Sequence, residues 1–139
     1  MENLNELNEL NELNEIPKQR HGCVTTWLII MIIANSLMAI LYFFFGDTIT
    51  QNLQGDFSNS IMIILGILGI ANVIFAVLLL KWKKVGFFGF LVSGIVALGV
   101  NIYLGLGVGQ SIGGLFGIVI LYGILQIKKD NISAWNNLE

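Results

Sequence analysis

The side chains of this sequence that could bind a ligand are few, and several of them lie inside long apolar stretches. Asn35, Asn72, Asn101 and Tyr122 each interrupt such a stretch. Amide and phenol groups can hold an uncharged ligand by donating and accepting hydrogen bonds. They do not change charge near neutral pH, whereas proton or ion coupling needs a group that does. These residues are therefore candidates for binding a neutral molecule or for joining helices, and they argue against coupled ion transport.

The residue types used in catalysis are scarce. Cys23 is the single cysteine, and His21 lies two positions before it, which is weak evidence for a reactive thiol. The apolar stretches contain no metal-ligand cluster, nucleophile pair or carboxylate pair. The glycine-rich stretch 105–109 lacks the Lys and Ser/Thr of a phosphate loop and reads as a hairpin connection. We expect no enzymatic activity, no cofactor and no metal.

Four apolar runs must position these residues, at about 24–45, 61–80, 85–105 and 111–127. The chain is 55% hydrophobic and only 12% charged, with a mean hydropathy of +0.79. A helix of roughly 17–25 residues crosses a hydrocarbon core of about 30 Å. The first three runs meet that length comfortably, and the fourth is at the short end. Since the runs are apolar on every side, we expect four transmembrane helices and no barrel strands.

The basic residues indicate how the helices cross the membrane. All seven fall in three clusters, 18–20, 81–84 and 128–129, which four crossings would place on one side. Cytoplasmic loops carry the excess of Lys and Arg. The sequence thus predicts an all-α up-down bundle of four transmembrane helices in the inner membrane, with both termini cytoplasmic.

Three regions follow from this pattern. Residues 1–20 form an acidic low-complexity tail with repeated Asn-Glu-Leu, which we interpret as solvated, with a partner-binding helix as the alternative. Residues 21–130 form the transmembrane bundle. Residues 131–139 form a cytoplasmic C-terminal tail, in which Trp135 should lie on the membrane surface or fold back under the bundle.

Two of the asparagines, Asn35 and Asn72, are expected at a similar depth in the membrane. At 1.5 Å per residue, Asn35 lies roughly 15 Å above Thr25, and Asn72 roughly 12 Å above the inner end of its helix. We therefore expect a hydrogen bond between them that sets the register of the first hairpin. The alternative is that both line a polar site for a substrate or an ion. Asn101 lies near the outer edge and needs another partner, such as Gln110 or loop backbone.

Small residues recur every four positions through the third and fourth runs, at Gly89, Ser93, Ala97, Asn101, Gly105, Gly109, Gly113 and Gly117. Small residues let membrane helices approach closely. We expect this ridge to pack the third helix against the fourth within one chain. A homodimer face is the alternative.

Three segments carry a resemblance: Arg20 to Trp27, Lys81 to Phe87, and Leu121 to Ile127 with the later Trp135. In these segments the chain resembles small four-span bacterial membrane proteins of no assigned function. The resemblance implies the same fold and carries no catalytic residue.

The function that the sequence favours is a non-enzymatic membrane module that acts through helix packing, as a homo-oligomer or as a subunit of a membrane complex. One alternative is a carrier or pore for a small neutral or lipid-like molecule at Asn35, Asn72 and Tyr122. Another is a membrane-permeabilising effector. The expected partners are the lipid bilayer and membrane proteins, and no nucleic acid.

Overall fold

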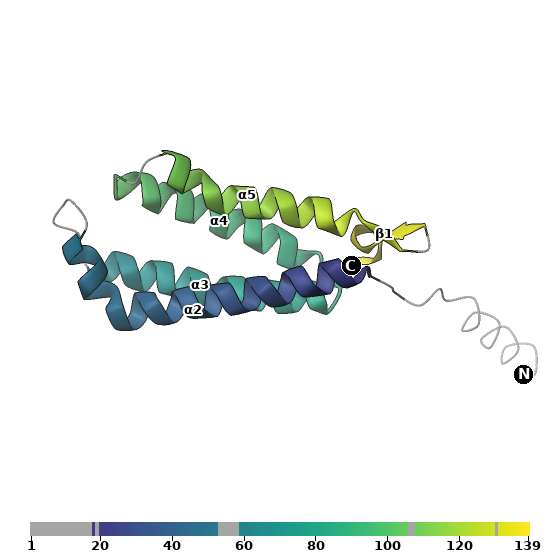
Figure 1. Cartoon of the computed structure of the whole chain (residues 1–139), viewed down its shortest axis with the longest axis horizontal. Helices are drawn as coiled ribbons and strands as arrows, with labels where there is room; N and C mark the ends of the chain where they lie inside the picture. The colour runs from purple at the N-terminus through teal and green to yellow at the C-terminus, as the bar shows by residue number, and fades with distance from the viewer. Residues whose placement is uncertain (1–17, 19, 53–58, 106–107, 130) are drawn as a thin grey trace, which may run out of the picture.

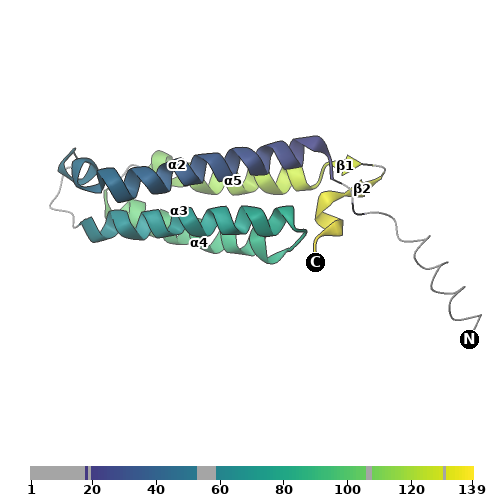
Figure 2. The ribbon, with the colours of Figure 1, turned by 90° about the horizontal axis from the view of Figure 1, so that it is seen from below.

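The computed structural model describes residues 18, 20–52, 59–105, 108–129 and 131–139. These residues form four helices of alternating direction: α2 (Gly22–Asn52), α3 (Asn59–Leu80), α4 (Val85–Tyr103) and α5 (Val108–Leu125). Each helix packs on the next, and α5 returns to contact α2 (Figures 1 and 2). Two short strands follow, β1 (Lys128–Lys129) and β2 (Ile132–Ser133), and then the 3₁₀ helix η1 (Ala134–Asn137).

Three described helices are long and apolar enough to cross a membrane: α2, α3 and α4. Their length and composition indicate a multi-pass helical membrane protein. The apolar part of α5, Ile112–Leu125, is shorter. Many large apolar side chains point outward, as expected for helices surrounded by lipid, and Phe44 is 79% exposed.

Helix α2 is longer than the sequence suggested. The first apolar run was expected to end at about residue 45, whereas the helix continues through Gly46 to Asn52. No proline interrupts this stretch, and the Thr50 hydroxyl donates a hydrogen bond to the carbonyl of Asp47 within it. At 1.5 Å per residue, a 31-residue helix extends for about 46 Å, which exceeds the hydrocarbon thickness.

The basic clusters lie at one end of the helices, which we call the basic end. It contains Lys18, Arg20, the α3–α4 turn, β1, β2 and η1 (Figures 1 and 2). The opposite end, where α2 and α4 finish and α3 and α5 begin, is the far end.

The larger apolar core occupies the basic half. It draws residues from all four helices and from the C-terminal segment: Val24, Leu28, Ala76, Leu79, Phe90, Ile118, Leu121, Leu125, Ala134 and Leu138. Leu28, Ala76 and Leu121 are completely buried. A second and smaller core lies toward the far end, where Met62, Leu65 and Leu104 are buried against partly buried neighbours.

The C-terminal segment folds back under the helices, as one of the two alternatives for Trp135 predicted. The Trp135 ring packs edge-on against the rings of Phe87 and Tyr122, with centroid distances of 5.0 and 5.2 Å. The β1–β2 hairpin turns through Asn131 at φ 66°. The segment expected as a tail is therefore part of the packed structure.

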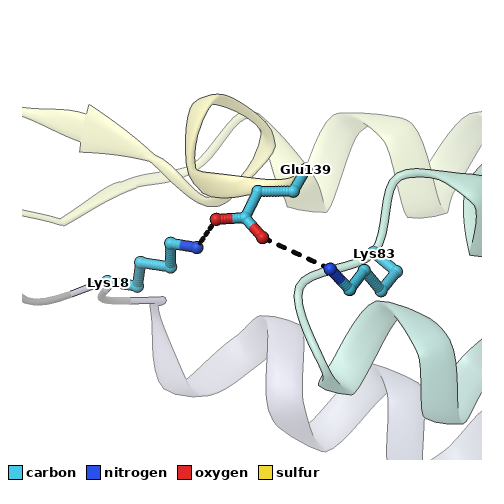
Figure 3. Close-up of polar contacts among 3 residues, drawn as sticks. All are labelled: Lys18, Lys83 and Glu139. Carbon is cyan, nitrogen blue, oxygen red and sulfur yellow. Dashed lines mark hydrogen bonds and ion pairs between the residues drawn. The ribbon is translucent and has the colours of Figure 1, made fainter.

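Glu139 attaches this segment to two of the basic clusters (Figure 3). Its carboxylate pairs with Lys18, and its other oxygen lies 3.4 Å from the Lys83 ammonium. Its backbone N–H donates to the Trp82 carbonyl at 2.7 Å, and its carbonyl accepts from the Lys84 N–H. Hydrogen bonds from Lys18 and Lys83 lower the pKa of the Glu139 carboxyl, which keeps it ionised.

Arg20 closes the end of α3. Its guanidinium donates to the carbonyls of Leu79 and Leu80 and lies 3.9 Å above the Trp82 ring. Both carbonyls belong to the last turn of α3, and the Leu79 carbonyl also accepts from the Trp82 N–H at 3.1 Å. A cation at the C-terminal end of a helix interacts favourably with the helix dipole. Trp82 has φ 64°, a conformation that usually takes glycine, and the stacked guanidinium compensates for part of that cost.

Candidate functional site: a polar cavity between three helices

A cavity of about 170 Å³ lies between α2, α3 and α4, in the half of the molecule toward the far end. Its walls carry three carboxamides and a phenol, those of Asn35, Asn72, Asn101 and Tyr42. The remaining lining residues are apolar: Met38, Leu65, Leu68, Gly69 and Ala97. None of the lining residues is charged at neutral pH. The cavity therefore offers hydrogen bonds in an apolar surrounding.

A chain of hydrogen bonds forms the inner wall of this cavity. The Ser93 hydroxyl donates to Oδ1 of Asn72, and Nδ2 of Asn72 donates to Oδ1 of Asn35 at 3.0 Å. Nδ2 of Asn35 donates to the Met31 carbonyl one turn earlier, at 2.8 Å. The Asn35–Asn72 contact is the one that their depths in the sequence predicted. The structure extends it to α4, so that one polar chain joins three helices.

This chain leaves hydrogen-bonding capacity at the cavity. A carboxamide has two N–H donors and an oxygen with two lone pairs. Asn35 and Asn72 each use one N–H in the chain described above. The remaining N–H of each can serve a bound molecule.

Asn101 and Tyr42 form the other polar part of the wall. Within the described residues, no hydrogen bond engages the side chain of either one, although both line the cavity. The sequence suggested Gln110 or loop backbone as the partner of Asn101. The Gln110 side chain lies outside the described residues, and the structure places the Asn101 side chain at the cavity instead.

Tyr122 is not part of this site. It lies at the basic end, where its ring packs against Phe87 and Trp135. The proposed grouping of Asn35, Asn72 and Tyr122 is therefore wrong for Tyr122. The reason is its place three residues before the end of α5, close to the folded C-terminal segment. The phenol at the cavity is that of Tyr42.

The ridge of small residues packs differently from the expectation. A Cβ atom at Gly89 would overlap the Phe75 ring of α3. The Ser93 hydroxyl donates a hydrogen bond to Asn72, which also belongs to α3. Ala97 and Asn101 line the cavity. The ridge on α4 thus faces α3 and the cavity, and the prediction that it packs on the fourth helix is wrong.

A different glycine makes the α4–α5 contact. A Cβ at Gly94 would overlap Ile118 of α5. In contrast, Cβ atoms at Gly105, Gly113 and Gly117 would meet nothing within 4 Å. Gly113 and Gly117 therefore do not pack against any other helix among the described residues. Spacing by four marks one face of a helix, and it cannot say which neighbour covers that face.

A second groove of about 250 Å³ lies on another face of α2 and α3. Apart from Ser36 its lining is apolar: Ala39, Ile40, Phe43, Phe44, Ile70 and Val73. The described residues contain no cluster of three or more His, Cys, Asp or Glu that could hold a metal ion. Cys23 is exposed. The three-helix cavity is therefore the place where the described polar groups converge.

Comparisons of the chain with protein-family models, curated proteins and solved structures gave no match.

Proposed function

We propose that the chain is a four-crossing protein of the inner membrane, with α5 as the fourth span and both termini in the cytoplasm. The bias of Lys and Arg toward the basic end supports this orientation. At 18 residues α5 is about 27 Å long, close to the hydrocarbon thickness, and thinning of the bilayer accommodates a short span at modest cost.

The proposed topology has a direct test. A phosphatase fused at Gln54 should be active outside the cell, and one fused after Glu139 should be inactive. The opposite pattern would exclude the proposed orientation. Activity at both positions would exclude α5 as a fourth span.

Within this topology, we propose that the protein is a non-enzymatic carrier that binds a small neutral or lipid-like molecule in the three-helix cavity. The observation that supports it best is the convergence of Asn35, Asn72, Asn101 and Tyr42 on one space among apolar helices. Ligand sites are typically apolar with a few polar groups that orient the ligand. Polar groups inside a membrane are costly and usually have a function.

The test compares two matched substitutions in the purified full chain. Ala97→Phe fills the cavity from α4, whereas Ala34→Phe adds the same bulk at an exposed position of α2. Mass spectrometry of extracted small molecules should find one class enriched with the wild type and with Ala34→Phe, and depleted with Ala97→Phe. Equal profiles for all three proteins would reject the carrier proposal.

A second candidate is the helix-packing module, as a homo-oligomer or as a subunit of a membrane complex. Its support is the open surface at Gly113 and Gly117, since close approach of another helix needs small residues without their own neighbours. Gly113→Leu with Gly117→Leu should then lower the detergent-solubilised oligomeric mass without lowering thermal stability. An unchanged mass would count against this candidate.

A further inference from the structure

We propose that the cavity holds the uncharged head group of a membrane amphiphile, which enters sideways from the lipid between α2 and α4. This inference rests on the carrier proposal and goes beyond it in three respects: the route, the size of the bound group and its charge.

The route follows from what surrounds the cavity. Toward the basic end, the large core that includes Leu28, Ala76 and Leu121 fills the space between all four helices. Toward the far end, Met62, Leu65 and Leu104 are buried against one another and against Tyr42. Apolar packing therefore lies above and below the cavity along the helix axes.

The side walls are incomplete. The lining residues belong to α2, α3 and α4, and none belongs to α5 among the described residues. Val24 and Leu28 of α2 share the large core with Leu121 and Leu125 of α5, at the basic end. On the cavity wall, the Met38 side chain of α2 is 44% exposed, so the cavity is open on this side to the surroundings of the helices. A lateral opening suits a ligand dissolved in the bilayer and does not suit a through-pore for a water-soluble one.

The size of the bound group follows from the volume. An apolar cavity of about 150 Å³ accommodates benzene. The cavity here measures about 170 Å³ and so holds a group of about six non-hydrogen atoms, far less than a whole lipid. The bound group is a head group, and the hydrocarbon chain extends into the membrane. A glycerol unit has this size and carries hydroxyls that pair with carboxamides.

The charge follows from the wall. A charged group taken into an apolar site is strongly unfavourable unless an opposite charge accompanies it. Among the residues that the structure describes, no Asp, Glu, Lys, Arg or His lines the cavity. The spare N–H groups of Asn35 and Asn72, with the Asn101 amide and the Tyr42 hydroxyl, pair instead with hydroxyl or carbonyl oxygens. The wall therefore selects an uncharged head group.

The experiment uses the full chain in lipid nanodiscs with a photoreactive 1-O-alkylglycerol as the probe. Unlabelled competitors are the same alkylglycerol, its analogue with one hydroxyl replaced by an ammonium, and glycerol without a chain. The alkylglycerol should compete at least about tenfold better than the ammonium analogue, which corresponds to about 1.4 kcal/mol. Glycerol should not compete. Cross-links should map to α2 and α4 around the cavity.

Substitutions locate the site. Asn101→Leu keeps a similar volume while removing the amide, and should weaken alkylglycerol competition more than that of a plain alkane of equal length. Ser36→Ala, in the apolar groove on the other face, should leave competition unchanged.

The possible failures are distinguishable. Labelling that is equal in Ala97→Phe and Ala34→Phe would reject the cavity as a binding site and the carrier proposal with it. Labelling that depends on Ala97 but does not distinguish the neutral from the ammonium head group would overturn the inference alone. Competition by glycerol equal to that of the alkylglycerol would overturn the lateral route.

Discussion

The two halves of this molecule are built differently. The basic half has a continuous apolar core from four helices and the C-terminal segment, closed by Arg20 and Glu139. The far half has a small core of three buried residues and a polar cavity beside it. This difference indicates that the basic half stabilises the bundle, whereas the far half leaves a cavity between the helices. The predictions below test that difference, beginning with the largest expected effect.

The large core should dominate stability. Leu121→Ala removes a completely buried side chain at the centre of this core and should lower the free energy of unfolding by about 2–5 kcal/mol. Leu37→Ala, at a position 57% exposed to the lipid region, is the matched control and should have a much smaller effect. Unfolding of the detergent-solubilised protein by SDS measures both. Similar losses of unfolding free energy in the two variants would contradict a stabilising role of the large core.

The α3–α4 contact near the basic end should tolerate no added atom. Gly86→Ala would place a Cβ against the Phe75 carbonyl oxygen, which cannot turn away, and should cost about 1–3 kcal/mol. Gly99→Ala lies in the same helix with nothing within 4 Å and should be neutral or stabilising by about 0.5–1 kcal/mol. Thermal unfolding compares the two. Equal destabilisation would mean that α4 does not pack on α3 through Gly86.

The hydrogen-bond chain through Asn72 should contribute modestly to stability, and the Tyr42 hydroxyl should contribute nothing. Asn72→Ala removes the hydrogen bonds with Asn35 and Ser93, each worth about 0.6 kcal/mol in a membrane, so a loss of about 1 kcal/mol is expected. Tyr42→Phe removes a hydroxyl that has no partner among the described residues and should leave stability unchanged. A large loss in Tyr42→Phe would assign this hydroxyl to the structure and not to a ligand.

The Glu139 contact should give the smallest effect, because its ion pairs are exposed to solvent. Its pKa in the folded protein lies below the ordinary value of 4.5, so it stabilises the docked segment above that pH. The contribution is lost as the pH falls through the lowered pKa. Tryptophan fluorescence of the wild type should change in that acidic range, and Glu139→Gln should lack this transition. An identical transition in the variant would assign it to another group.

Much of the site was accessible from the sequence. Counting along two antiparallel helices predicted that Asn35 and Asn72 meet, because helix rise is fixed and each run begins or ends at a basic cluster. The role of Tyr42 was not accessible. The next three residues, Phe43, Phe44 and Phe45, are also aromatic. Only the rotation of α2 about its axis decides which of the four rings faces α3 and α4. The same uncertainty explains the misplaced glycine ridge.

The sequence by itself determined the class of the protein, since long apolar runs without charges need a lipid environment. It also predicted the positions along their helices at which Asn35 and Asn72 meet. The tertiary structure decided which faces meet. Gly89 and Ser93 of α4 pack against α3, and Gly94 of α4 packs against α5. A cavity remains beside three asparagines. The physical reason is that hydropathy fixes the position of a residue along a helix, whereas rotation about the axis depends on packing against neighbours. In runs that are apolar on every side, no amphipathic stripe records that rotation.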